Sequence, residues 1–321
     1  MNLVFLENKS AGGYTMRVFV TGVSGYAGFY AALRLAATGH SVTGLVRNPE
    51  QPRLNILRIQ EVALVRGDVG EPAAYRAELE RSDVVIHTLL DKRRPLETDR
   101  ALFGALEELP ARALPRRFIY TTGCSIFGKV PVAIMDERTE PNPDHPLAFR
   151  RALEKEALAL NNVSTVVLRP GFMFGNDGFN SVSTDWFAMA EAGDLVFRGD
   201  RERGWSWIHI SDLAEAYRLV VEADDSIVKG EIFHLADERR PLSIEVMRAC
   251  ADAAGFTGEI QFEGPKKGDN ISTWFNQNEF ITPQKARERL GWSARHPGII
   301  ESAKPVYKSW KAAQDLNKVS V

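Results

Sequence analysis

Three regularly spaced glycines, Gly22, Gly25 and Gly28, are the strongest chemical signal in this sequence of 321 residues. They stand between an apolar run, residues 17–21, and a helical pattern that begins at Tyr26. In such a strand–turn–helix unit the first glycine permits a tight turn and the second lets the backbone approach a pyrophosphate. The third lets the helix pack closely on the sheet, and the helix's first N–H groups point at the phosphates. The pattern predicts a dinucleotide site with contacts from Thr21, Gly22, Ser24, Gly25, Tyr26, Ala27 and Gly28.

The end of the next predicted strand selects the form of the dinucleotide. Sites for NAD place an acidic residue there for the ribose hydroxyls, whereas the 2′-phosphate of NADP calls for arginine. This chain has Leu45-Val46-Arg47-Asn48 and no acid. Arg47 can hold a phosphate with two donors and stack on adenine, so we expect NADP, with NAD as the second option. The alternative for Arg47 is a solvent-facing side chain after a strand.

The elements that must hold these residues alternate along the first half of the chain. Short β-branched runs predict strands at residues 17–21, 41–46, 62–65, 83–89, 117–121 and 164–168. Helical patterns separate them at residues 26–38, 72–80, 96–109 and 146–160. Continuous apolar strands indicate burial on both faces, which is typical of a parallel sheet covered by helices. The sequence therefore predicts an α/β fold with a Rossmann-type, doubly wound parallel sheet.

The carboxyl ends of these strands extend the expected site, because open α/β sheets bind ligands at that edge. Asp68, after the third strand, could accept a hydrogen bond from the adenine amine, or it could only cap the next turn. The further expected cofactor contacts at this edge are Val69, Leu89, Thr121, Pro170 and Phe172.

The alternation changes after residue 170. Residues 171–204 are rich in aromatic residues and glycine and show no clear period. Beyond them we expect strands at 207–210 and 231–235 and helices at 211–222, 241–254 and 282–290. We divide the chain into a flexible N-terminal extension (1–15), a dinucleotide-binding domain (16–170, completed by 206–237) and a smaller α/β substrate-binding lobe (171–205 and 238–310).

From Met16 to about Ala303 the chain resembles an extended short-chain dehydrogenase/reductase of the NAD-dependent epimerase/dehydratase type. The resemblance rests on segments that occur in the family's order: the glycine turn at 21–28, the strand at 83–87, Leu168-Arg169-Pro170 with Phe174-Gly175, the strand–helix join at 207–214 and the closing helix at 285–292. It implies a bound nicotinamide dinucleotide and an oxidoreductase or epimerase-like enzyme that acts on a small molecule.

The catalytic signature implied by this resemblance is missing. Usual members carry Ser or Thr after the fifth strand and Tyr-x-x-x-Lys on the next helix, where the lysine depresses the tyrosine pKa. Aligning Pro146 with the proline that often precedes that tyrosine places Leu147 at the tyrosine and Arg151 at the lysine. Leucine cannot exchange a proton, and arginine could hold the ribose but stays protonated. We expect an atypical site in which Arg151 contacts the cofactor and Thr122 or Ser125 donates the proton.

Other chemically suggestive residues have simpler explanations. A literal Tyr-x-x-x-Lys at 307–311 lies in the C-terminal tail, far in sequence from any cofactor-lining element, and we interpret it as chance. Cys124 is expected to be a small buried hydrophobe and not a thiolate nucleophile. An aromatic cluster follows residue 170 and predicts either core packing or a pocket for a substrate with an apolar or aromatic part. Its members are Phe172, Phe174, Phe179, Trp186, Phe187, Trp205 and Trp207.

Composition excludes several other classes. Lys and Arg number 40 and Asp and Glu number 42, so the chain lacks the basic excess of a nucleic-acid binder. Cys124 and Cys250 lie far apart in no metal-ligand spacing, which predicts a reducing, cytoplasmic setting and no bound metal. No apolar run approaches the length of a membrane span. A homodimer is one option for the assembly.

Three functions remain open at this level. We expect an NADP-dependent oxidoreductase that acts on a small organic substrate through a non-standard catalytic site. One alternative is a non-redox enzyme, for a cyclisation or rearrangement, that uses the bound dinucleotide as part of its pocket. The other alternative is a dinucleotide-sensing binding protein. The missing dyad favours the alternatives, and the expected aromatic pocket favours catalysis.

Overall fold

The computed structural model describes residues 15–264 and 276–319, and the expected extension at 1–15 lies outside this range except for residue 15. Its centre is a seven-stranded sheet with the order β10-β6-β5-β4-β1-β2-β3 and only parallel pairings. The strands are β1 (Arg17–Thr21), β2 (Ser41–Val46), β3 (Ala63–Arg66), β4 (Val84–His87), β5 (Arg116–Thr121), β6 (Val163–Pro170) and β10 (Ile232–Leu235). The predicted doubly wound parallel sheet is confirmed.

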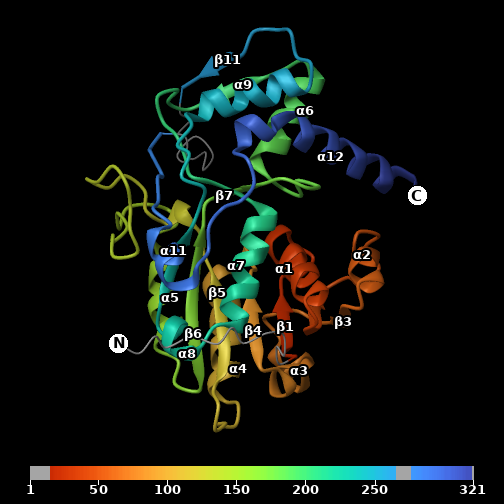
Figure 1. Ribbon diagram of the computed structural model, residues 1–321, viewed down its shortest axis with the longest axis vertical. Helices are drawn as coiled ribbons and strands as arrows, with labels where there is room; N and C mark the ends of the chain where they lie inside the picture. Colours follow the sequence, from red (N-terminus) through yellow and green to blue (C-terminus); the bar gives the residue numbers. More distant parts are fainter. Residues whose placement is uncertain (1–14, 265–275, 320–321) are drawn as a thin grey trace, which may run out of the picture.

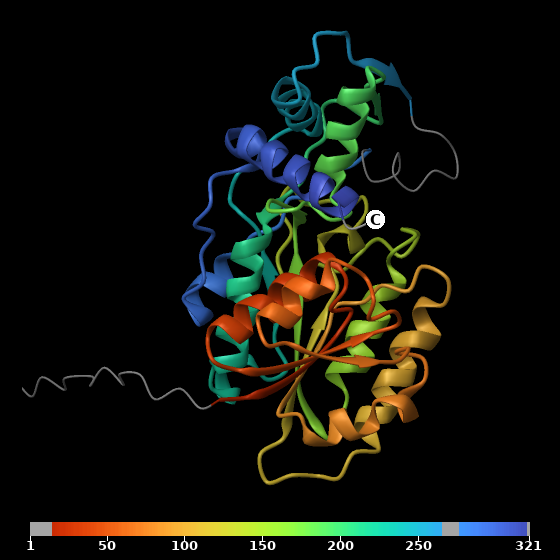
Figure 2. The same cartoon turned by 90° about the vertical axis from the view of Figure 1, so that its right-hand side faces the viewer.

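Helices cover both faces of this sheet (Figures 1 and 2). One face packs against α1 (Tyr26–Ala37), α2 (Leu54–Ile59), α7 (Ile210–Glu222) and α11 (Gln284–Leu290). The other face packs against α3 (Arg76–Arg81), α4 (Pro95–Glu107) and α5 (Phe149–Leu158). The short helix α8 (Asp225–Val228) precedes β10. Burial on both faces explains why the strands are continuous apolar runs.

A smaller lobe stands over the carboxyl edge of the sheet (Figure 1). It contains α6 (Val182–Ala192), α9 (Ser243–Ala253) and α12 (Ile299–Val319), with the paired strands β8 (Val196–Arg198) and β11 (Gln261–Glu263). Aromatic side chains dominate its core, and Trp205 and Trp207 are fully buried there. Core packing therefore accounts for much of the aromatic cluster predicted from the sequence.

Several local predictions differ from the structure. The strand expected at 207–210 is β9 (Trp207–His209), which pairs with β7 (Phe172–Phe174) in a separate two-stranded sheet and does not join the central one. The helix expected from Pro146 begins at Phe149, and the helix expected at 72–80 is split into a 3₁₀ turn (Pro72–Ala74) and α3. Tyr75 lies between them outside the helical region.

No helix in the described part of the chain combines the length and the apolarity needed to cross a membrane.

Candidate functional site

The turn between β1 and α1 has a backbone that only glycine fits at two positions. Gly22 has a φ of +79°, and an added Cβ would lie 3.0 Å from the backbone nitrogen of Leu89. At Gly28 a Cβ would lie 2.5 Å from the carbonyl oxygen of Gly22. The N–H of Gly25 closes the turn on that same carbonyl at 2.9 Å. Because α1 begins at Tyr26, its first N–H groups face outward from the turn, as an anion site requires.

A cavity of about 380 Å³ adjoins this turn at the carboxyl ends of β1, β2, β3 and β4. Arg47 lines it, is exposed, and forms no ion pair with another described residue. Lys92 and Arg93 line it as well, so its cations outnumber its two carboxylates, Asp68 and Asp91. The predicted contact residues in its lining are Gly22, Ser24, Arg47, Asp68, Val69 and Leu89. The cavity is therefore suited to a ligand with an anionic group beside the end of β2.

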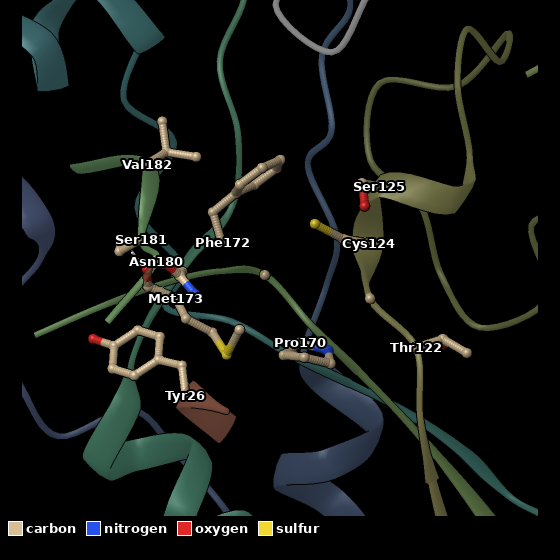
Figure 3. A pocket seen from close by; sticks show the side chains of 12 residues that line it. Tyr26, Thr122, Cys124, Ser125, Pro170, Phe172, Met173, Asn180, Ser181 and Val182 are labelled. Carbon is tan, nitrogen blue, oxygen red and sulfur yellow. Dashed lines mark hydrogen bonds between the residues drawn. The ribbon is translucent and has the colours of Figure 1, made fainter. Parts of the chain in front are cut away.

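A second cavity, of about 170 Å³, lies at the ends of β5 and β6 beneath the lobe (Figure 3). One wall comes from Thr122, Gly123, Cys124 and Ser125 after β5. The opposite wall is formed by Tyr26, Met173 and Phe172, together with Asn180, Ser181 and Val182, which precede and begin α6. Pro170 and Gly171 form its floor at the end of β6. This pocket combines an apolar wall with a few hydroxyl and amide groups.

The two predicted proton donors differ in their surroundings. The hydroxyl of Thr122 donates a hydrogen bond to Glu154 Oε1 at 2.6 Å, and its side chain points away from the cavity in Figure 3. Ser125 is half-buried at the cavity, and its hydroxyl has no hydrogen-bond partner among the described residues. Its carbonyl lies 2.7 Å from His145 Nε2, which fixes the loop. Only Ser125 therefore offers its hydroxyl to a ligand in this geometry.

Cys124 lies on the same wall, with its sulfur directed into the cavity (Figure 3). Burial, together with the nearby carboxyl group of Glu279, raises the pKa of the Cys124 thiol well above its usual value. A neutral thiol is a poor nucleophile. The side chain therefore contributes an apolar, polarisable surface to the pocket.

A fully buried ion pair lies directly behind Thr122. Arg169 on β6 donates to both carboxylate oxygens of Glu154 on α5, with distances of 2.9 Å and 2.5 Å. Arg169 also lies 3.3 Å from His234 Nε2, and its guanidinium lies over the ring of Phe127. Sequence reasoning missed this pair, although Arg169 stands in the Leu-Arg-Pro segment on which the resemblance rests.

The structure does not bring Leu147 and Arg151 to the cavities. Arg151 instead contacts Glu140 at 2.8 Å and Glu154 at 3.4 Å, and this geometry does not support the expected ribose contact. The preceding residue, Arg150, is buried and donates to the Thr121 carbonyl at 2.9 Å, at the end of β5. The expected register on α5 is thus displaced by one residue. The displacement arises because Glu154, one helical turn after Arg150, is held toward the sheet by Arg169.

Other predicted residues also lie beside the site and not in its walls. The hydroxyl of Thr121 pairs with Tyr217 at 2.7 Å, and that of Thr21 lies 2.6 Å from His87 Nδ1, so both face the protein interior. Gly25, Ala27 and Gly28 shape the turn and the start of α1.

The Tyr-x-x-x-Lys at 307–311 lies on α12, where Tyr307 and Lys311 both bond to Glu191. Both groups lie outside the walls of the two cavities, in agreement with their interpretation as chance.

Sequence reasoning also missed the pocket residues of the lobe, Met173, Asn180, Ser181 and Val182. They lie in a stretch without periodicity, so no pattern could have found them. The residues of 15–264 and 276–319 contain no cluster of three His, Cys, Asp or Glu side chains placed as metal ligands.

The glycine turn at the point where the sheet order reverses, together with a pocket roofed by a second lobe, defines a dinucleotide-binding Rossmann protein. A profile of the NAD dependent epimerase/dehydratase family matches residues 18–236, and the chain belongs to this family.

Known proteins with similar sequences or structures support this assignment. An uncharacterized protein of Saccharomyces cerevisiae, YLL056C, is 25% identical over 91% of this chain and 99% of its own length. A Stigmatella aurantiaca ketoreductase of a farnesylated dihydroquinoline oxide is 25% identical over 69% of this chain and 68% of its own length. The UDP-glucose 4-epimerase of Thermus thermophilus, solved with NAD, has a TM-score of 0.75 and 21% identity over 93% of this chain and 100% of its own. The first of these covers nearly the whole chain, and the last shares the fold. This protein is therefore an epimerase-like enzyme.

The buried ion pair generates a stability prediction. Glu154→Gln removes the charge that neutralises Arg169, so we expect a loss of about 3–5 kcal/mol in the free energy of unfolding. Urea denaturation measures this loss. The matched control on the same helix is Glu156→Gln, which breaks an exposed pair with Arg100 and should cost less than about 1 kcal/mol. Equal losses in the two variants would contradict a special role for the buried pair.

Proposed function

We propose that this chain is an NADP-dependent oxidoreductase that interconverts a ketone and an alcohol on a small molecule with an apolar or aromatic part. The observation that carries the proposal is the adjacency of two cavities at one sheet edge. One has a glycine cradle and Arg47, which forms no ion pair within the described part of the chain. The other has an apolar wall and the hydroxyl of Ser125, which has no hydrogen-bond partner in that same part of the chain.

The residues present fit a dinucleotide. The positions of Gly22 and Gly28 leave no space for a Cβ, and the open N–H groups of α1 suit the pyrophosphate. Arg47 would hold the 2′-phosphate, and Asp68 and Val69 would border the adenine. When bound, NADP supplies or accepts a hydride at its nicotinamide ring.

The lining of the second cavity supports an apolar substrate. Phe172, Met173 and Val182 offer apolar surface, and the ring of Phe172 is held by stacking on Trp205 with centroids 4.1 Å apart. The ketoreductase of Stigmatella aurantiaca, whose name gives an aromatic substrate with a farnesyl chain, is consistent with such a pocket. Asn180 and Ser125 would supply the few directed hydrogen bonds that orient the substrate.

Within this mechanism Ser125 is the group that faces the substrate oxygen. Its hydroxyl would donate a hydrogen bond that stabilises the negative charge developing on that oxygen and would then transfer its proton to it, with the serine reprotonated from solvent water. The neighbouring Thr122 hydroxyl remains committed to Glu154, and it keeps the strand end in place. Arg150 fixes the Thr121 carbonyl and thereby the backbone that leads into this wall.

Cofactor selectivity provides the first test of this proposal. Arg47→Ala removes the guanidinium at the end of β2, so NADP should bind more weakly by about 1.5–3 kcal/mol, the range for a hydrogen bond to a charged group. The affinity for NAD should hardly change, because NAD lacks the 2′-phosphate. Titration calorimetry with both dinucleotides measures the difference. Arg66→Ala, an exposed arginine at the end of β3 outside the cavity wall, is the control. Equal losses for both dinucleotides, or a wild-type preference for NAD, would contradict NADP selectivity.

The second test concerns the two hydroxyls. With an apolar aromatic ketone that the wild type reduces, Ser125→Ala should lower kcat by about 10²–10³-fold, the usual effect of losing one donor to a developing oxyanion. Thr122→Val should leave kcat within an order of magnitude but lower stability, because Glu154 loses one donor. If Ser125→Ala kept full turnover, a water molecule would be the proton source. If the wild type bound NADP but reduced no ketone, a non-redox or sensing role would replace this proposal.

A further inference from the structure

Arg53, which precedes α2, occupies an unusual position between two aromatic rings. Its guanidinium carbon lies 3.6 Å from the ring centroid of Phe29 on α1 and 4.4 Å from that of Phe179 in the substrate-binding lobe. The side chain is only 11% exposed. Cation–π attraction is strongest for desolvated cations, so this arrangement holds the guanidinium firmly in one plane.

The edge of the same guanidinium connects two loops. Its Nη1 donates to the Ser24 carbonyl at 3.0 Å, and its Nε donates to Asp177 Oδ2 at 2.8 Å. Ser24 belongs to the phosphate turn and lines the first cavity. Asp177 belongs to the loop between β7 and α6, which leads directly to the pocket residues Asn180 and Ser181. One side chain therefore bonds to a segment of each subsite.

The loop at residues 175–180 depends on such anchors. Gly175, Asn176, Gly178 and Asn180 all have positive φ, a backbone conformation that needs support from its surroundings. The hydroxyl of Tyr26 donates to the Gly175 carbonyl, and the Asp177 N–H donates to the Tyr30 hydroxyl at 3.4 Å. All of these partners, like Phe29, stand on the first turns of α1, directly after the phosphate turn.

We propose that Arg53 is a positioning residue that couples the phosphate turn to the loop at 175–180, so that dinucleotide binding orders the substrate pocket. This inference rests on the function proposed above. Phosphates seated on the turn hold the Ser24 carbonyl in place, and Arg53 transmits that restraint to Asp177. Only a guanidinium suits this position, because it presents donors in two directions from one plane whose faces stack on rings.

The test compares Arg53→Lys and Arg53→Met with Arg58→Met, a control on α2 whose arginine bonds to Asn55 and Pro49 and to no other residue that the structure describes. Lysine keeps the charge, and methionine keeps much of the packing between the rings. Both lose the paired hydrogen bonds, so both should weaken NADP and NAD alike, by about tenfold. If Arg53 contributed only its charge, Arg53→Lys would keep the wild-type affinity for the dinucleotides. If it contributed only its bulk, Arg53→Met would keep that affinity. Thermal unfolding checks that each variant is folded.

Hydrogen–deuterium exchange measures the coupling itself. In the wild type, saturating NADP should slow exchange both in the turn, residues 22–28, and in the loop, residues 175–180. In Arg53→Met the turn should still be protected by saturating NADP, but the loop should not. Asp177→Asn should also uncouple the loop, and adding it to Arg53→Met should cause no further change, because the two residues act through one contact.

The outcomes separate the two proposals. Loop protection that persists in both Arg53 variants would overturn the coupling while leaving the cofactor assignment intact. A wild type that binds neither dinucleotide would overturn the proposed function, and the coupling to the cofactor with it. In that case, faster loop exchange in ligand-free Arg53→Met would still be expected from the loss of the contact with Asp177.

Discussion

Two opposite charges, Glu154 and Arg169, lie fully buried between α5 and β6, immediately beneath the second cavity. Removing such charges from water is costly, and the cost is offset only where every donor and acceptor finds a partner. Here Arg169 donates hydrogen bonds to both carboxylate oxygens of Glu154, and Thr122 donates to the same carboxylate. Burial and the adjacent guanidinium lower the pKa of His234 well below its usual value, so its ring remains neutral and can accept from Arg169.

This pair determines what the neighbouring residues can do. It fixes the rotation of α5 about its axis, so Arg150, four residues earlier, reaches the end of β5, while Arg151 turns toward Glu140. It also engages the Thr122 hydroxyl, which leaves Ser125 as the hydroxyl that faces the cavity. The choice of hydroxyl that faces the cavity thus follows from an electrostatic requirement below it.

The central sheet and the phosphate turn could be predicted because their causes are local. Most strands of the sheet are short apolar runs buried on both faces, whereas the edge strand β3 is only partly buried. Gly22 and Gly28 are required by the backbone of the turn itself and by its contact with the residues after β4. The lobe could not be predicted to the same extent. Short strands such as β7, β8 and β11 lack periodicity, and α6 carries aromatic residues whose partners, Trp207 and Trp310 among them, are distant in sequence. Helices α2 and α12 were not predicted either.

The expected register on α5 was displaced for a related reason. The register on α5 was inferred from one proline, Pro146, which lies outside the helix, whereas the true register is set by Glu154 through a partner on another strand. A sequence pattern can locate groups that act through their own backbone, as the glycines do. It cannot locate groups whose orientation depends on an ion pair between residues distant in sequence. Arg151 was assigned to the site because the pair of Glu154 and Arg169 could not be read from the sequence.

The two halves of the site therefore obey different constraints. The phosphate turn and the cavity around Arg47 are built from backbone and strand ends of one rigid sheet, which suits a ligand whose shape does not vary. The reacting half takes its walls from the β5 loop and from residues 172–182, and loops on a rigid scaffold tolerate change in side-chain chemistry. Such a division allows the side chains that face the substrate to vary while the dinucleotide cradle persists. It also requires a physical connection between the halves, because a pocket that forms without the cofactor would bind substrate unproductively. The chain supplies this connection at the N-terminal end of α1, where Tyr26, Tyr30 and Arg53 hold the lobe's loop against the turn.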